Sequence, residues 1–249
     1  MSLDEIRVLG TRAHPISMQE TLSRCIELSR GLGNQHVVIN AAKVVSLQED
    51  SLLRSTIDEA SLVGIDGQSV VWAARWLGYD VPERVAGIDL MHEIIRAAPG
   101  ENLRLYFLGA EQSVVEKVVE FAEARGCTVA GFRNGYWTDE EESTIVSDIA
   151  DLNVNVLFLG LPSPRKEHFV RTYRQALNTG LTIGVGGSFD VIAGKTLRAP
   201  SWMQKSGLEW AYRLSQEPKR MLKRYLVGNA KFIRIVLKEK LGPRSERPD

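Results

Sequence analysis

The sequence has few cysteines, no excess of one charge and no long apolar run. Cys25 and Cys127 stand far apart, without the spacing of a metal site, so we expect two buried thiols in a reducing compartment. Lys plus Arg equals Asp plus Glu at 31 each, so the overall charge predicts no nucleic-acid partner. No apolar run approaches the ~18 residues of a membrane span, and no secretory pattern opens the chain. We therefore expect a cytoplasmic protein.

Several motifs that would define a reaction are also missing. The four histidines (14, 36, 92 and 168) show no metal-ligand spacing, and there is no Asp-x-Asp pair of the kind that holds a divalent cation on a sugar nucleotide. Gly194-Lys195-Thr196 resembles the end of a P-loop, but the required first glycine is replaced by Phe189. The glycine fingerprint of dinucleotide-binding enzymes is absent, which disfavours an NAD-type oxidoreductase without excluding it. We therefore expect no metal and no cofactor.

What is present is an alternation of apolar strands and helices over most of the 249 residues. Short apolar runs predict strands at residues 6–9, 36–39, 61–65, 103–108, 127–132, 155–159 and 181–185. Between them, helical periodicity predicts helices at 18–30, 68–77, 89–98, 114–125, 139–152 and 165–177, with a further helical stretch over 41–60. The pattern predicts an α/β, Rossmann-like fold with a largely parallel sheet and helices on both faces.

Small or polar residues follow most of the predicted strands. Ligands of open α/β sheets bind at the carboxyl ends of the strands, and here those ends carry Asn40, Asp66, Gly109, the Gly160 turn and Gly186-Gly187. Such turns favour a nucleotide diphosphate, because backbone N–H groups can approach it closely. Asp66 has two interpretations from local sequence, a general base at the mouth of the site or a cap of the following helix.

The last fifth of the chain is basic. Between Arg198 and Arg247, Lys and Arg outnumber Asp and Glu by thirteen to four, and apolar residues are interleaved with them over 212–240. An amphipathic basic segment of this kind is typical of a helix lying on an anionic membrane surface. A helix docked on its own domain or on a partner subunit fits the composition equally well.

An ordered set of short motifs then identifies a family. The motifs are Val37-Val-Ile-Asn40, Ile65-Asp-Gly-Gln68, Arg84-Val-Ala-Gly-Ile-Asp89, Phe107-Leu-Gly-Ala110, Gly135-Tyr136, Leu159-Gly-Leu-Pro-Ser-Pro164 with Glu167, Gly184-Val-Gly-Gly-Ser-Phe-Asp190, Arg198-Ala-Pro, Gly207-Leu-Glu-Trp210, Arg213 and Glu217-Pro-x-Arg220. In this combination the chain resembles the WecG/TagA/CpsF family of bacterial glycosyltransferases, which build capsules, exopolysaccharides and cell-wall polymers.

The resemblance implies a reaction. It implies metal-independent, inverting transfer of a sugar from a UDP-sugar donor to an undecaprenyl-diphosphate-linked acceptor, at the inner face of the cell membrane. It also implies a division into a Rossmann-like catalytic domain at 1–197 and a C-terminal appendage at 198–249 that serves the membrane and the active site. The sequence leaves the oligomeric state open, with a homo-oligomer among the alternatives.

The resemblance also assigns roles to residues. Asp66 matches the base that deprotonates the acceptor hydroxyl, and the donor-binding positions are Asn40, Gly109, Tyr136, Ser163, Lys166, Glu167, Gly186, Gly187 and Asp190. Within that set Tyr136 and Asp190 match positions that hold the uridine. Arg213, Arg220 and Lys223 match basic positions facing the acceptor diphosphate or the membrane.

Two positions depart from the family pattern. Val38 stands where members often have Thr, and Lys166 stands where they usually have Gln. A cation in place of an amide accommodates an acidic or differently hydroxylated sugar, so glucosyl and glucuronyl donors stay open beside N-acetylmannosamine. The departures also leave open a catalytically lapsed member that binds a nucleotide sugar as a scaffold.

Overall fold

The computed structural model describes residues 4–216 and 218–242, with the backbone alone at 201, 205, 213 and 218–227. The strands are β1 Ile6–Val8, β2 Thr11–Ala13, β3 Asn34–Ile39, β4 Leu62–Ile65, β5 Arg104–Gly109, β6 Thr128–Arg133, β7 Val156–Gly160 and β8 Leu181–Gly184. The helices are α1 Met18–Ser29, α2 Ala41–Ser46, α3 Ser51–Asp58, α4 Gln68–Leu77, α5 Gly87–Ala97, α6 Gln112–Glu123, α7 Glu142–Ala150, α8 Arg165–Tyr173, α9 Ser188–Ile192, α10 Ser201–Lys205, α11 Glu209–Gln216 and α12 Pro218–Leu241. A 3-10 turn, Asp139–Glu141, precedes α7.

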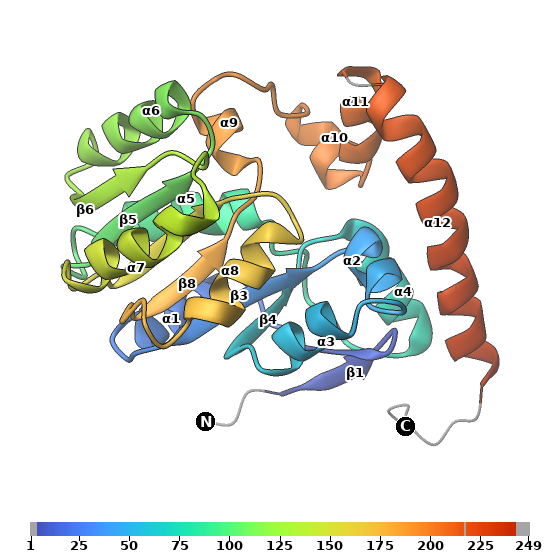
Figure 1. Ribbon diagram of the computed structural model, residues 1–249. Coiled ribbons are helices and arrows are strands. Elements are labelled where there is room, and N and C mark those ends of the chain that lie inside the picture. The colour runs from blue at the N-terminus through green and yellow to red at the C-terminus, as the bar shows by residue number, and fades with distance from the viewer. Residues whose placement is uncertain (1–3, 217, 243–249) are drawn as a thin grey trace.

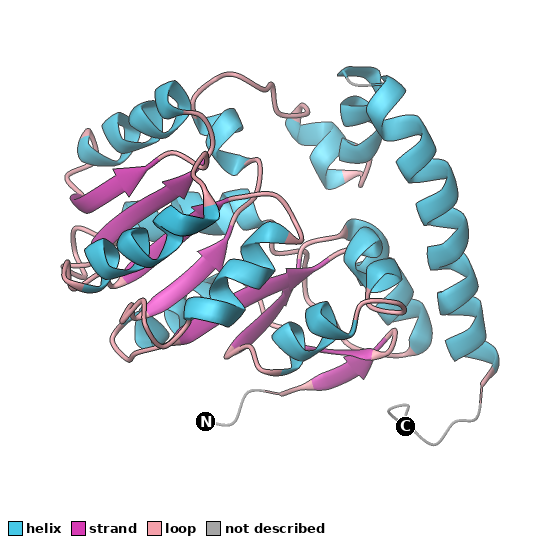
Figure 2. Ribbon diagram, in the orientation of Figure 1, coloured by secondary structure: helices cyan, strands magenta, loops and turns pink. Residues whose placement is uncertain are grey.

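Six of the strands form one sheet, and all of its pairings are parallel. Its order is β4-β3-β8-β7-β5-β6, and helices lie on both faces of it (Figure 2). The predicted Rossmann-like fold is confirmed. β1 and β2 form a separate antiparallel hairpin. β2 was not predicted, because Thr-Arg-Ala contains no apolar run.

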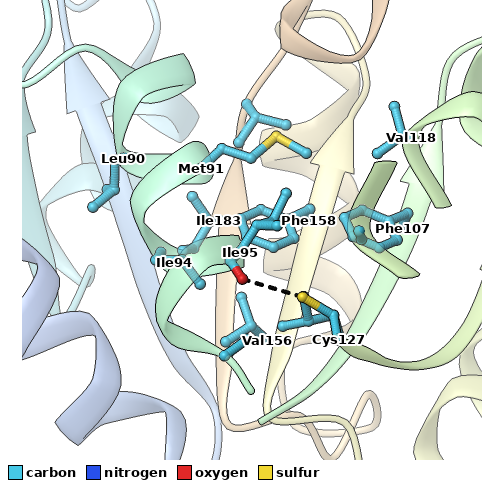
Figure 3. Close-up of a cluster of buried hydrophobic side chains, with 14 of the residues drawn as sticks. Leu90, Met91, Ile94, Ile95, Phe107, Val118, Cys127, Val156, Phe158 and Ile183 are labelled. Carbon is cyan, nitrogen blue, oxygen red and sulfur yellow. Dashed lines mark hydrogen bonds between the residues drawn. The ribbon is translucent and has the colours of Figure 1, made fainter. Parts of the chain in front are cut away.

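Alternate residues of the central strands pack into different cores. Leu105 and Phe107 join a cluster with α1, α5 and α6, whereas Tyr106 and Leu108 join a second cluster with α7 and α8. Figure 3 shows the first cluster, in which the buried Cys127 thiol donates to the carbonyl of Ile95 at 3.1 Å. Both cysteines are free and buried, as expected. This double coverage explains why the strands read as continuous apolar runs.

The helical stretch after β3 is divided into two helices. Asn40 begins α2 by accepting a hydrogen bond from the Lys43 N–H, and Asp50 begins α3 by accepting one from the Leu53 N–H. Each side chain satisfies a backbone donor that the first helical turn leaves unpaired. The first of these caps fixes the backbone of a predicted donor-binding residue.

The chain after residue 197 is helical, and its last helix is packed on the body of the protein. α12 runs alongside α2 and α4 (Figure 1), and Phe232 and Val236 lie in the same buried cluster as strands β3 and β4. The Leu9 N–H also donates to the Glu239 carboxylate at 3.1 Å. Of the two open interpretations of this segment, docking on its own domain is therefore observed. No helix in the described part of the chain is long and apolar enough to cross a membrane.

Candidate active site

The strand order has a switch point between β3 and β8 at the carboxyl edge of the sheet, which we call the β3–β8 crevice. Pairing of these two strands ends at His36 and Ile183 although β3 continues to Ile39. The chain leaves β3 through α2 towards β4, whereas it leaves β8 through α9, which packs against α6 on the other side (Figure 1). Strand connections that depart in opposite directions leave a crevice where ligands of α/β proteins bind.

Asp66 and Asn40 lie next to each other on one wall of this crevice. The Asp66 N–H donates to the Ile39 carbonyl at 3.0 Å, and a Cβ atom placed on Gly67 would lie 3.0 Å from the Asn40 Cα. The N-cap of α4 is Gly67, so the interpretation of Asp66 as that cap is wrong. The Asp66 side chain is half-buried at the carboxyl end of β4, in a position that suits a base facing a ligand.

Behind this wall lies a buried charge cluster. The Lys43 and Lys166 ammonium groups lie 3.2 and 3.3 Å from the same Glu167 oxygen, Oε1. The Ser163 hydroxyl donates to the other oxygen, Oε2, at 2.8 Å. The three charged side chains are 11%, 14% and 3% exposed. The fold therefore brings together, in this one cluster, three residues that were predicted in the donor site: Ser163, Lys166 and Glu167.

The environment shifts the pKa values of this cluster. Burial, together with the Lys166 charge, lowers the pKa of Lys43 to about 8, against the opposing effects of Glu167 and Asp66. Burial alone would raise the pKa of Glu167, but the two lysines and the Ser163 hydroxyl outweigh it and lower that pKa. Lys43 was missed by sequence reasoning, because a single lysine in an amphipathic helix carries no motif.

The opposite end of the carboxyl edge carries the residues predicted to hold uridine. The Tyr136 side chain follows β6 and is 70% exposed. Asp190 on α9 faces Lys195, whose ammonium lies 3.9 Å from Asp190 Oδ1 and 2.7 Å from Glu111 Oε1. Lys195 belongs to the sequence that resembled a P-loop, and its pairing with Glu111 joins two loops far apart in sequence.

Glycines keep the middle of the edge free of side chains. A Cβ atom on Gly109 would lie 2.5 Å from the carbonyl carbon of Gly160, and one on Gly160 would lie 2.5 Å from the Phe189 ring. Gly186 adopts φ +53°, and a Cβ atom there would meet nothing within 4 Å. Gly187 is exposed beside it. The middle of the carboxyl edge, between the Lys43–Lys166–Glu167 cluster and the Asp190–Lys195 pair, is therefore lined by backbone and open space.

The chain after β8 is tied back to the mouth of the crevice by two ion pairs. The Arg198 guanidinium binds both oxygens of Asp89, at 2.6 and 2.7 Å, and Arg84 lies 3.0 Å from Glu209. The hydrogen bonds to Asp89 raise the pKa of Arg198, with smaller contributions from Glu209 and Asp66. Asp66 thus lies within electrostatic reach of both Lys43 and Arg198.

The predicted site residues form two groups rather than one. Asp66, Asn40, Ser163, Lys166 and Glu167 surround the β3–β8 crevice, and Gly109, Tyr136 and Asp190 lie towards β6. At roughly 4.8 Å per strand, the five intervals from β4 to β6 span roughly 24 Å, a length that suits an extended ligand. The side chains of Arg213, Arg220 and Lys223 lie outside the described residues. Among those described, no three His, Cys, Asp or Glu residues converge in a way that would hold a metal ion.

Comparison with known proteins shows which family the chain belongs to. Residues 6–246 match the Glycosyl transferase WecG/TagA/CpsF family. The chain belongs to this family. It is 34% identical over 185 residues to an N-acetylglucosaminyldiphosphoundecaprenol N-acetyl-beta-D-mannosaminyltransferase of Bacillus subtilis (strain 168), a match that covers 74% of this chain and 71% of the relative. The enzyme with the same description from Bacillus spizizenii is 32% identical, with the same coverage. The protein is accordingly a glycosyltransferase, and an NAD-type oxidoreductase is set aside.

Proposed function

We propose that the protein transfers a sugar from a UDP-sugar to a polyprenyl-diphosphate-linked acceptor, with inversion at the anomeric carbon, in the synthesis of an exopolysaccharide, capsule or cell-wall polymer. The observation that carries the proposal is the position of Asp66, half-buried at the β3–β8 crevice. The names of the two Bacillus enzymes, which describe a lipid-linked acceptor, support the same class of acceptor here.

Asp66 would act as the general base of this reaction. Its carboxylate accepts the proton of the acceptor hydroxyl as that oxygen attacks the anomeric carbon. The bond from the anomeric carbon to the diphosphate oxygen breaks on the opposite face, and UDP leaves with the electron pair. Arg198 lies near enough to influence Asp66, so the tied-back segment after β8 contributes to the electrostatics of the base.

No divalent cation is needed in this proposal. The sequence contains no Asp-x-Asp pair, and the N–H groups of Val185, Gly186 and Ser188 already donate to carbonyls of the chain. Charge that develops on the leaving diphosphate would therefore be stabilised mainly by basic side chains. Arg213, Arg220 and Lys223 are the candidate cations for the acceptor diphosphate or the lipid headgroups.

The outer face of α12 suits attachment to the inner face of the cell membrane. Ile233, Leu237 and Leu241 are 56%, 45% and 84% exposed, and their spacing of four residues places them on one stripe. Exposed Lys231, Arg234 and Lys238 lie among them. A helix with apolar and basic residues on its exposed side fits the surface of an anionic leaflet.

The proposal is tested by Asp66→Asn. The amide keeps the shape of the carboxylate but accepts no proton at neutral pH, so turnover should fall by roughly 10²–10⁴ while the affinity for UDP stays close to wild type. Release of UDP in the presence of a lipid-linked acceptor is the measurement, and Asp80→Asn, at an exposed position after α4, is the control with unchanged turnover. Asp66→Asn at the wild-type rate would refute the role of the base. A wild-type protein that binds UDP-sugars without transfer would support the lapsed scaffold instead.

A further inference from the structure

Helix α4, which begins two residues after the base Asp66, exposes two tryptophans on its outer face. Trp72 and Trp76 are each 52% exposed. The buried residues of the same helix are Val70, Val71, Ala73, Ala74 and Leu77. The exposed face of an amphipathic helix normally carries polar residues. The two indole rings therefore form an apolar surface that the described part of the chain leaves half uncovered.

Gln68, Trp72 and Trp76 lie on one stripe along α4, which we call the tryptophan stripe. Residues four apart are neighbours on the surface of a helix, and the stripe from Gln68 to Trp76 is about 12 Å long. Gln68 is half-buried, as is Asp66. Because α4 starts at the carboxyl end of β4, the tryptophan stripe starts beside the base and leads away from it.

The turn between α10 and α11 lies against the start of the tryptophan stripe. A Cβ atom on Gly207 would lie 2.7 Å from Cη2 of Trp72 and 2.8 Å from Cγ of Gln68. A residue with a side chain would push the turn away from α4, so glycine permits this close approach. The turn thus covers one side of the Trp72 ring and leaves the rest of the stripe open.

The residues along this path change character in the order that a lipid-linked sugar requires. Asp66 would face the acceptor hydroxyl. The polar Gln68 follows it, and Arg84, which is 14% exposed and lies 3.0 Å from Glu209, is held beside the same end of the stripe, since Glu209 is two residues after the glycine of the turn. The indole rings come last. Sugar, diphosphate and isoprenoid chain are joined in that order in a polyprenyl-diphosphate-linked acceptor.

At its far end the tryptophan stripe meets the C-terminal helix. The Lys240 ammonium lies 5.3 Å from the centre of the Trp76 ring and donates to the Trp76 carbonyl at 2.8 Å. Leu241, the next residue, is 84% exposed and belongs to the apolar side of α12 that is proposed to face the membrane. The tryptophan stripe therefore connects the base with the side from which a lipid-linked acceptor would arrive.

The size of the tryptophan stripe favours a single lipid chain over a second protein. A Trp side chain buries roughly 150–250 Å², so two half-exposed indoles offer roughly 200 Å². A stable protein interface needs about 800 Å² on each partner. Trp rings also prefer the headgroup level of a bilayer, which is where the isoprenoid chain of a membrane-bound acceptor begins.

We propose that Trp72 and Trp76 bind the isoprenoid chain of the acceptor and hold its first isoprene units along α4 while the sugar lies at Asp66. This inference rests on the proposed function and adds a lipid subsite to it. Binding the chain on the protein fixes the distance between the lipid and the base, so the acceptor hydroxyl is presented to Asp66 in one position.

Binding of soluble prenyl diphosphates, measured by calorimetry with UDP at saturation and without vesicles or detergent, tests the proposal. The wild type should bind farnesyl diphosphate roughly thirtyfold more tightly than inorganic diphosphate, because the chain covers roughly 80–100 Å² of apolar surface. Trp72→Ala should weaken geranyl and farnesyl diphosphate alike, by about fivefold. Trp76→Ala, one turn further from the base, should weaken farnesyl diphosphate more than geranyl diphosphate.

Three controls accompany these variants. The affinities for UDP and for inorganic diphosphate should be unchanged in both alanine variants. Trp72→Phe should retain most of the preference, since it keeps an aromatic ring on the stripe. Leu32→Ala removes an apolar side chain that is 69% exposed, on the turn before β3, and should leave the preference as in the wild type. Circular dichroism of each variant checks that the fold is retained.

The possible outcomes separate the lipid subsite from the proposed function. Equal affinity of the wild type for farnesyl and inorganic diphosphate, or a preference that both alanine variants retain, overturns the subsite and leaves the glycosyl transfer intact. If the variants keep the preference but bind less well to vesicles containing phosphatidylglycerol, the stripe is a bilayer contact. If they keep it but change mass in light scattering, the stripe joins two copies of the chain. Either result also overturns the subsite. A wild type that binds no UDP and transfers no sugar refutes the proposed function, and the prenyl series without UDP then still tests the stripe.

Discussion

Replacing Lys43 by Met should stabilise the protein at neutral pH. Burial and Lys166 lower the pKa of Lys43 from 10.5 to about 8, and each pKa unit corresponds to about 1.4 kcal/mol. Keeping the ammonium protonated in the folded state at pH 7 therefore costs about 3 kcal/mol. Met has a similar unbranched stem and no charge, and Glu167 retains Lys166 and Ser163 as partners.

The sign of the pH dependence follows from proton binding. Below pH 8 the lysine is protonated in both states, and between pH 8 and 10.5 only the unfolded state binds the proton, so wild-type stability rises with pH. The advantage of Lys43→Met should accordingly shrink by about 2 kcal/mol between pH 7 and pH 9.5.

Urea unfolding of both proteins at the two pH values is the assay, with Lys117→Met as the exposed control whose effect is the same at both. A Lys43→Met protein that is less stable at pH 7, or whose difference from wild type does not change with pH, would refute the reasoning.

Three further predictions concern the carboxyl edge of the sheet. Gly109→Ala should destabilise the protein by about 2–3 kcal/mol, because a Cβ atom there would lie 2.5 Å from the Gly160 backbone. In Gly186→Ala the new Cβ atom meets open space, so this variant should lose only about 1 kcal/mol for its left-handed conformation. Thermal unfolding of the two variants measures the difference. Tyr136→Ala removes a side chain that is 70% exposed, so the stability of the protein should hardly change. The affinity for UDP should fall about tenfold if the tyrosine ring stacks on the uracil ring. Activity should survive excess chelator, and a complete loss that manganese or magnesium restores would contradict the metal-independent proposal.

The parallel sheet was predictable because its strands are buried on both faces. Leu105 to Leu108 read as one apolar run, since alternate residues enter different cores, and that run predicts a strand covered on both sides. The pairing of β3 with β8 was not predictable, because nothing in either segment specifies a partner nearly 150 residues away. It is this pairing, and its early end, that makes the crevice.

The candidate site also contains residues that local sequence predicts and residues whose importance depends on tertiary packing. Asn40, Asp66 and Gly186 were predicted from the composition of strand ends and from the family motifs, because both signals are local. Lys43 was missed because its importance depends on Glu167 and Lys166, which reach it only through tertiary packing. The pairs Arg198–Asp89 and Arg84–Glu209 were hidden for the same reason, although all four residues lie in motifs that the sequence singled out.

The packing of α12 changes how the C-terminal part of the chain should be understood. A division at residue 197 suggests a body that folds alone, with an appendage that can be removed after Ala199. Phe232 and Val236 are only 6% and 7% exposed, within the core cluster that also contains Ile39 and Ile65. These two strand residues directly precede Asn40 and Asp66. Removing α12 would expose that cluster beneath both site residues, so loss of activity in a truncated protein would not distinguish a membrane role from a damaged site. Charge changes on the exposed face of α12, at Arg234 and Lys238, leave the buried contacts in place and therefore isolate the membrane role.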